Sequence, residues 1–167
     1  MLGFSLRLIE KRDSAAVNKI REANTSEYLK SLQEIDPKRY SSVVRWSRHW
    51  HTVSMDFFNF YLKSGSSFVA EVRGEVVGFV YSQTIRFMHS EQRMMWVEYV
   101  GVLKEYQRHG IGQALLTKVV DYAKQHSIPR IESTINPDNL PSIRVHEKAD
   151  FKVRDWNRAT YGLRHMG

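Results

Sequence analysis

Residues 94–112 read MMWVEYVGVLKEYQRHGIG and decide the fold. The first ten of them, 94–103, are apolar almost throughout, which predicts a strand in the middle of a sheet. After Ile111 the apolar residues recur at helical spacing and predict a helix that continues to about residue 126, as seen at Leu115, Val119 and Tyr122. A short turn with two glycines separates the two elements. Such a turn presents the first amides of the helix to an anion.

Outside this segment the chain alternates between strand and helix patterns. Asp13 is a suitable N-cap for a first helix, and residues 26–64 read as mostly helical with an interruption at Pro37. A second helix over about 42–63 is rich in aromatic residues, which favours packing on a sheet. The remaining expected elements are strands at 6–10, 67–73, 76–87 and 130–135, a turn at Gly74-Glu75, a helix at 141–148, and a closing hairpin from 151–156 and 159–163. We expect one α/β domain over residues 1–167.

Composition excludes several classes of protein. Hydrophobic residues make up 42% and charged residues 26% of the chain, as in ordinary globular domains. There is no cysteine, so disulfides, thiolate metal sites and a cysteine-linked acyl intermediate are impossible. No HExxH motif occurs, and we expect no metal. No apolar run is long enough for a membrane span, and the charged N-terminus does not resemble a signal peptide. We therefore expect a cytoplasmic protein.

The net charge of +7 attracts any anion and does not choose between partners. The basic residues are dispersed and no nucleic-acid-binding motif appears, so a nucleic-acid module is the least favoured function. The turn at residues 107–112 is more specific. Glycine at Gly110 and Gly112 leaves the amides open to a pyrophosphate, and Arg108 can add a charge-assisted contact. A Walker loop would end in Gly-Lys-Ser/Thr, and a Rossmann turn would carry three glycines near the first strand, so neither fits.

Gln107, Gly110 and Gly112 match Gln/Arg-x-x-Gly-x-Gly/Ala, and the segment thereby resembles the GNAT superfamily of acetyltransferases. The likeness covers nearly the whole chain. Downstream, Asn139 followed by residues 146–151, HEKADF, is similar to the family's Asn-(six residues)-Tyr-Glu-x-x-Gly-Phe. The resemblance implies an α+β fold with a central mixed, mostly antiparallel sheet of about six to seven strands and about four flanking helices.

The same resemblance implies acetyl-CoA as the co-substrate. Its pyrophosphate would lie on the turn and the first helical amides, and its pantetheine arm would pair with the strand before them. The implied contacts are Arg108, His109, Gly110, Ile111, Gly112 and Gln113 for the pyrophosphate, together with Gln107 of the signature, and Val100, Gly101 and Val102 for the pantetheine. Asn139 resembles the family residue that hydrogen-bonds the pantetheine. It is equally suited to cap the helix at 141–148.

Glu98 is the one charge in the apolar strand 94–103. A buried carboxylate needs a partner or a water-lined cleft, and desolvation raises its pKa, which suits a general base. By the resemblance, Glu98 lies where some family members carry a Glu that deprotonates the amine through water. The alternative is a structural ion pair with a neighbouring strand, for example with Arg86 or Arg130.

His146 stands where many relatives carry the Tyr that protonates the leaving thiolate. An imidazolium can donate that proton, whereas a lone His on a short helix is often an ordinary surface residue. Tyr99 and Tyr161 are lesser candidates for the acid. Direct attack by the amine is the simplest route without cysteine, with the oxyanion met by an amide near Val100 or Val102.

The sequence thus predicts an acetyl-CoA-dependent N-acetyltransferase. The alternative is a non-catalytic acyl-CoA-binding sensor or partner domain with the same fold. The expected partners are acetyl-CoA and an amine, from a small molecule or a protein, without a membrane. The acceptor is left open, as is a homodimer, and residues 26–63 are expected to line the acceptor site.

Overall fold

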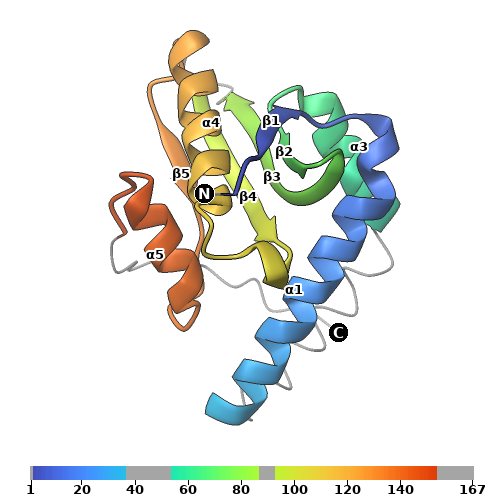
Figure 1. Ribbon diagram of the computed structural model, residues 1–167. Helices are drawn as coiled ribbons and strands as arrows, with labels where there is room; N and C mark the ends of the chain where they lie inside the picture. The colour runs from blue at the N-terminus through green and yellow to red at the C-terminus, as the bar shows by residue number, and fades with distance from the viewer. Residues whose placement is uncertain (1, 37–53, 87–92, 154–167) are drawn as a thin grey trace, which may run out of the picture.

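The computed structural model describes residues 2–36, 54–86 and 93–153 (Figure 1). In these ranges five strands form one sheet in the order β1-β2-β3-β4-β5. The strands are β1 (Ser5–Leu8), β2 (Phe68–Val72), β3 (Glu75–Arg86), β4 (Arg93–Val102) and β5 (Ile131–Ser133). The first four pair antiparallel, and β5 joins β4 in parallel. The predicted mixed, mostly antiparallel sheet is confirmed. Most of the expected closing hairpin lies outside the described residues.

Four α-helices flank the sheet in the described part of the chain: α1 (Ser14–Ile35), α3 (Ser54–Ser64), α4 (Ile111–Gln125) and α5 (Leu140–Lys148). Two single turns of 3-10 helix, η1 (Lys11–Asp13) and η2 (Lys104–Tyr106), precede α1 and follow β4. Figure 1 shows α4 in front of the sheet with α5 beside it, while α1 and α3 lie together by β3. None of the described helices is long and apolar enough to span a membrane.

The sheet buries an apolar core on each face. On the α4 face, Leu115, Leu116 and Val119 are fully buried against strand residues such as Val80 and Met95. On the other face, Val17 and Ile20 of α1 and Phe58 of α3 pack with Val69 and Phe79. Each fully buried aliphatic side chain contributes roughly 1.5–3 kcal/mol. The predicted helical face of 111–126 is thereby confirmed as core.

Two local predictions need correction. The hairpin turn between β2 and β3 is Arg73-Gly74, both with positive φ, and not Gly74-Glu75, because Glu75 already pairs with Val72. Asp13 does precede α1, but its side chain makes no capping bond. Its carboxylate instead accepts from Arg7 Nη1 and Nη2, at 2.7 and 2.8 Å, and from the Glu10 amide at 2.7 Å. This buried ion pair connects β1 to the start of α1.

Candidate active site

Strand β4 changes its pairing half-way along. Its first half is paired on both edges, since β5 bonds to it at Met95, Trp96 and Val97. Its second half, from Glu98 to Val102, pairs with β3, and β5 does not reach it within the described residues. The backbone groups on that edge of the strand are therefore available to a ligand or to another part of the protein.

A β-bulge occurs where the pairing changes. Tyr81 of β3 is opposite Tyr99, whereas the next residue, Ser82, is opposite Val97, so Glu98 is the extra residue. A bulge of this kind shifts the side-chain alternation by one. Met95 and Val97 belong to the α4-side core, and after the bulge Val100 and Val102 pack on the same core.

The bulge thus places two consecutive side chains on the opposite, α1/α3 face. Tyr99 packs with the core of that face and stacks on Phe79, with ring centroids 5.3 Å apart. Glu98 lies on the same face, because its carboxylate is close enough to the phenol of Tyr61 in α3 to raise the pKa of that phenol. The carboxylate also accepts a 2.7 Å hydrogen bond from Trp96 Nε1. Burial and then the Glu98 charge raise the pKa of Tyr61, so this phenol is a hydrogen-bond donor at neutral pH.

The expected structural ion pair of Glu98 is not formed with the proposed partners. Arg130 pairs with Glu132 of β5, its neighbour two residues along. No ion pair of Glu98 with Arg86 or any other cation occurs among the described residues. The half-buried carboxylate instead has the indole of Trp96 and the Tyr61 hydroxyl beside it.

The free edge of β4 presents the backbone of Val100 and Val102. Leu103 N donates to Val77 O at 2.9 Å. The backbone N–H and C=O groups of every second residue before it, Gly101 and Tyr99, therefore also point toward β3. Val100 and Val102 consequently face away from β3. At Val102 this edge is already occupied: with its amide oriented to satisfy both atoms, Asn24 of α1 donates to Val102 O at 3.1 Å and accepts from Val102 N at 3.2 Å.

Glycine at Gly101 leaves room for this arrangement. A Cβ there would lie 2.8 Å from Asn24 Nδ2, 3.0 Å from Tyr99 Cε1 and 3.1 Å from Phe79 Cε1. These three side chains would have to shift to admit it. Gly101 therefore lets α1 approach the end of β4 closely enough for Asn24 to reach its backbone.

The glycine turn begins α4 as the sequence predicted. Gly110 is the N-cap and has φ 83°, a left-handed conformation that glycine adopts without strain. The first helical bond is from Ala114 N to Gly110 O at 2.9 Å, so the amides of residues 111–113 precede the helical ladder. Arg108, also at positive φ (64°), and His109 are exposed beside them. These amides and Arg108 are positioned where an anion could bind.

The other polar residues of this turn connect it to its neighbours. Gln107 Nε2 donates to Val102 O at 3.1 Å, and Gln113 Nε2 donates to Lys148 O of α5 at 2.6 Å. Gly112 serves packing: a Cβ there would come within 3.1 Å of Val145 Cγ2 in α5. The sequence explanation, that Gly112 keeps the amides open, therefore omitted the approach of α5.

Helix α5 carries Asn139 and His146. Asn139 is the N-cap, and its Oδ1 accepts from Ser142 N at 3.2 Å, which confirms the capping role as one of its two predicted uses. His146 is buried, with 2% of its surface exposed. Its Nδ1 lies 2.8 Å from Ser142 O and donates to it, since a carbonyl can only accept, while the buried Nε2 has no partner. Burial lowers the pKa of His146, so the neutral ring is favoured.

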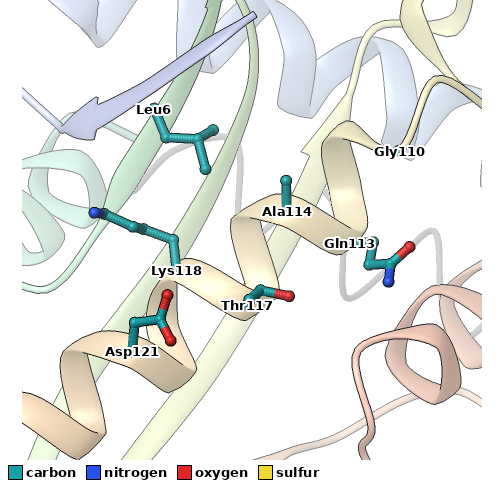
Figure 2. Close-up of a pocket in the computed structure, with 7 residues that line it drawn as sticks. All are labelled: Leu6, Gly110, Gln113, Ala114, Thr117, Lys118 and Asp121. Carbon is teal, nitrogen blue, oxygen red and sulfur yellow. The ribbon is translucent and has the colours of Figure 1, made fainter.

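An open groove of about 440 Å³ runs from the glycine turn along the outer side of α4. Figure 2 shows Leu6 of β1 facing Lys118 and other side chains on that helix. The groove reaches Gly110 and Gln113 but contains neither Glu98 nor any residue of β4. It is therefore continuous with the anion-binding turn and separate from the face that holds the carboxylate.

Comparison with known proteins agrees with this arrangement. The model of the acetyltransferase (GNAT) family matches residues 24–151, a range that contains β4, the glycine turn, α4 and α5. The chain belongs to the GNAT acetyltransferase family. The resemblance seen in the sequence is thereby confirmed over most of its length.

Individual relatives of this GNAT chain are distant. An uncharacterized N-acetyltransferase of Methanocaldococcus jannaschii is 28% identical over 138 residues, 78% of this chain and 58% of that protein. The L-2,4-diaminobutyric acid acetyltransferase of Nocardia farcinica is 38% identical over 82 residues, 48% of this chain and 40% of that protein. The chain thus spans about half the length of these curated relatives.

Solved structures share the GNAT fold. The aminoglycoside acetyltransferase AAC(6')-Iy, in complex with a bisubstrate analogue, superposes with a TM-score of 0.69 at 16% identity, over 97% of this chain and 99% of that one. Another structure of that enzyme contains CoA. At this identity the likeness concerns the fold alone.

Sequence reasoning missed four residues that the GNAT fold brings to this site: Arg21, Asn24, Tyr61 and Trp96. A signal for two of them was present. Arg21 and Asn24 lie four and seven residues after Val17, on the helical stripe that α1 buries, and a polar residue on such a stripe needs a reason. Tyr61 and Trp96 gave no such signal, because aromatic residues are common in cores. Tyr161 lies outside the described residues.

Proposed function

We propose that this chain transfers the acetyl group of acetyl-CoA to a primary amine by direct attack in a ternary complex. The observation that carries the proposal is the bulge that places Glu98 beside the free edge of β4, on a strand that leads directly into the anion-binding turn. The acetyl donor and the base for the amine would then meet on one strand.

The phosphates of acetyl-CoA would bind the amides of residues 111–113 together with Arg108, where the helix end favours negative charge. The pantetheine arm would follow the edge of β4 and donate to the C=O of Val100, which faces away from β3, so that the Val100 N–H is left for the oxyanion. To pair with Val102 as well, a pantetheine amide would replace the Asn24 side-chain amide, which offers the same donor and acceptor. Exchange of one amide for another leaves no backbone group of Val102 unpaired.

Glu98 would take the proton of the substrate ammonium, directly or through a water molecule, and so create the nucleophile. The free amine then attacks the thioester carbon, and the oxyanion is met by the Val100 amide at the strand edge. Collapse breaks the C–S bond, forms the amide and releases the thiolate, which takes up a proton. Tyr61 and Trp96 would hold the Glu98 carboxylate in place.

The acid that protonates the thiolate stays a prediction. His146 is buried with its pKa lowered, and its one proton is directed at Ser142 O, so the neutral ring offers only an acceptor at Nε2. Burial raises the pKa of Tyr99, which keeps that phenol protonated at neutral pH. The environment of these two groups favours a phenol over an imidazolium as the donor.

Release of CoA thiol tests the proposal. Purified protein mixed with acetyl-CoA and a panel of primary amines should produce thiol in proportion to acetylated amine, with no release in the absence of amine. Binding of acetyl-CoA without thiol release from any amine would instead support the sensor function. Neither binding nor release would overturn both.

A further inference from the structure

A buried cation on the α1/α3 face has one nitrogen that no hydrogen bond satisfies in the described part of the chain. Arg21 of α1 is 7% exposed, and its Nη2 atom is buried without a hydrogen bond. Buried Asp13, by contrast, is paired with Arg7 at 2.7 Å. A buried guanidinium nitrogen without a hydrogen bond is costly. No acidic group of the described residues lies in ion-pair range of Arg21.

The position of Arg21 is next to the proposed acceptor side of β4. Its charge lowers the pKa of Tyr81 and Tyr99 against the larger, opposing effect of burial, so the guanidinium lies close to both phenols. These two tyrosines are direct cross-strand partners on β3 and β4. One turn further along α1, Asn24 reaches the backbone of Val102. The Arg21 side chain therefore lies between α1 and the sheet. It is close to the second half of β4, whose outer edge is free.

Glu98 provides the opposite charge, and it lies beside a third tyrosine of the same aromatic group. Tyr61, beside Glu98, stacks on Tyr81 with ring centroids 4.6 Å apart. The carboxylate thus lies beside one ring of the Tyr61–Tyr81 stack and the guanidinium near the other, and the two charges are more than 4.0 Å apart because no ion pair joins them. Two opposite charges held apart in one partly buried face are complementary to a ligand that carries both charges.

We infer that the acceptor is an amino-carboxylate, whose ammonium group is held by Glu98 and whose carboxylate is bound by Arg21. This inference rests on the proposed acetyl transfer and specifies its substrate class. A guanidinium offers the paired donors that a carboxylate needs. A phosphate, with up to two charges, fits less well, because Arg21 is the one buried Lys or Arg among the described residues and Glu98 would repel it.

The first experiment needs no mutation. Rates of CoA thiol release are compared for alanine and alaninamide, and for lysine and lysinamide, each pair differing in the carboxylate alone. We expect kcat/KM to favour the acid of at least one pair by about 10- to 100-fold, the usual effect of one charge-assisted contact. The α-amine of an amino-acid amide is less basic than that of the amino acid, so more of it is unprotonated and nucleophilic at a given pH. This difference favours the amide, so a preference for the acid cannot be caused by it. Equal rates, or a preference for the amides, would overturn the inference.

Variants then assign the effect to Arg21. Arg21→Gln should lower kcat/KM for the acid about 10- to 100-fold and change that for the amide little, so that the preference disappears. Arg12→Gln, at an exposed arginine just before α1, should keep the wild-type preference. Equal losses for acid and amide in Arg21→Gln would show a structural role and reject the assignment. Should Arg21→Gln fail to fold, Arg21→Lys, which retains charge without the paired donors, must reduce the preference.

The two proposals fail differently. No thiol release from any amine would remove the proposed acetyl transfer itself. Release from the carboxamides with no advantage for the acids would retain acetyl transfer and reject only the amino-carboxylate acceptor.

Discussion

The two faces of the sheet bury different kinds of side chain. The α4 face is an apolar core in which Leu115, Leu116 and Val119 are completely buried. The α1/α3 face buries tyrosines among its apolar residues together with Arg21 of α1, and it carries Glu98 half-buried on β4. Since buried polar groups cost stability unless they are paired, we expect the first face to serve folding and the second to serve the proposed acetyl transfer.

One residue separates the two faces along β4. Without the bulge at Glu98, the strict alternation of a strand would place Glu98 and Tyr99 on opposite sides of the sheet. With it, both point to the polar face, while Val97 and Val100 both pack on the α4 core. Functional groups are thereby concentrated on one side without loss of core packing on the other.

The largest expected effect concerns the polar face. Glu98→Gln keeps the size of the side chain and an acceptor for Trp96, but it cannot take a proton from the substrate. We expect the rate to fall roughly 10²–10⁴-fold, while the melting temperature and the affinity for acetyl-CoA change little. The loss should shrink at high pH, where more of the amine is already neutral.

Glu75→Gln, at an exposed carboxylate on the β2–β3 hairpin, is the matched control and should retain full activity. A stable and fully active Glu98→Gln enzyme would remove the base from the mechanism. A large loss of stability with an unchanged rate per folded molecule would give Glu98 a structural role.

The apolar face should respond in the opposite way. Leu115→Ala removes a completely buried side chain from the α4 core and should lower the free energy of unfolding by about 2–5 kcal/mol. Turnover per folded molecule should stay near the wild-type value, because Leu115 belongs to the α4-side core and not to the face that holds Glu98. Denaturant unfolding and active-site-normalised rates on the same preparation measure both. A strong loss of turnover at wild-type stability would contradict the division between the faces.

The helix end that begins on the apolar face should be sensitive to charge. Acetyl-CoA at 100 times its dissociation constant should stabilise the wild type by about 2.7 kcal/mol. Gly110→Asp should abolish this thermal shift, since it places a carboxylate at the phosphate position. An added Cβ at Gly110 meets no atom within 4 Å, and Asp is among the residues that adopt a positive φ at modest cost, so the variant should fold with some loss of stability.

Gly110→Asn is the control, because Asn has the same shape as Asp and tolerates positive φ equally well. It should retain most of the shift. Loss of the shift in both variants would indicate steric exclusion, and a normal shift in Gly110→Asp would show that the phosphates bind elsewhere.

The smallest effect concerns His146, next to the seam between α4 and α5. Burial lowers its pKa below the ordinary value of 6.5, so below that pH the unfolded chain binds a proton that the folded chain does not. Stability should therefore be complete above about pH 6.5 and fall at lower pH, by at most about 1.4 kcal/mol per pH unit from this group. In His146→Asn, which can still donate to Ser142 O, this part of the acid dependence should vanish. An unchanged slope would mean that His146 is protonated in the folded protein.

Much of the fold could be predicted from local patterns. The strand at 94–103, the glycine turn and the helix from Ile111 were found with errors of a residue or two at their ends, because each is dictated by periodicity or by backbone conformation within a few residues. Glu98 was singled out for the same reason: a charge in an apolar strand is visible without a structure. Its ion pair with Arg86 or Arg130 was not formed, because strand register decides which side chains meet.

The sequence by itself therefore determined the family, the glycine turn before α4 and the anomalous carboxylate of this protein. Only the tertiary structure decided that β5 leaves one edge of the second half of β4 without a strand in the described part of the chain, that a bulge turns Glu98 and Tyr99 to one face, and that Arg21 and Asn24 of α1 lie against that face. The physical reason is distance along the chain. Turns and helices are set by neighbours a few residues apart, whereas Arg21 and Glu98 are brought to one surface by packing, which depends on every element at once.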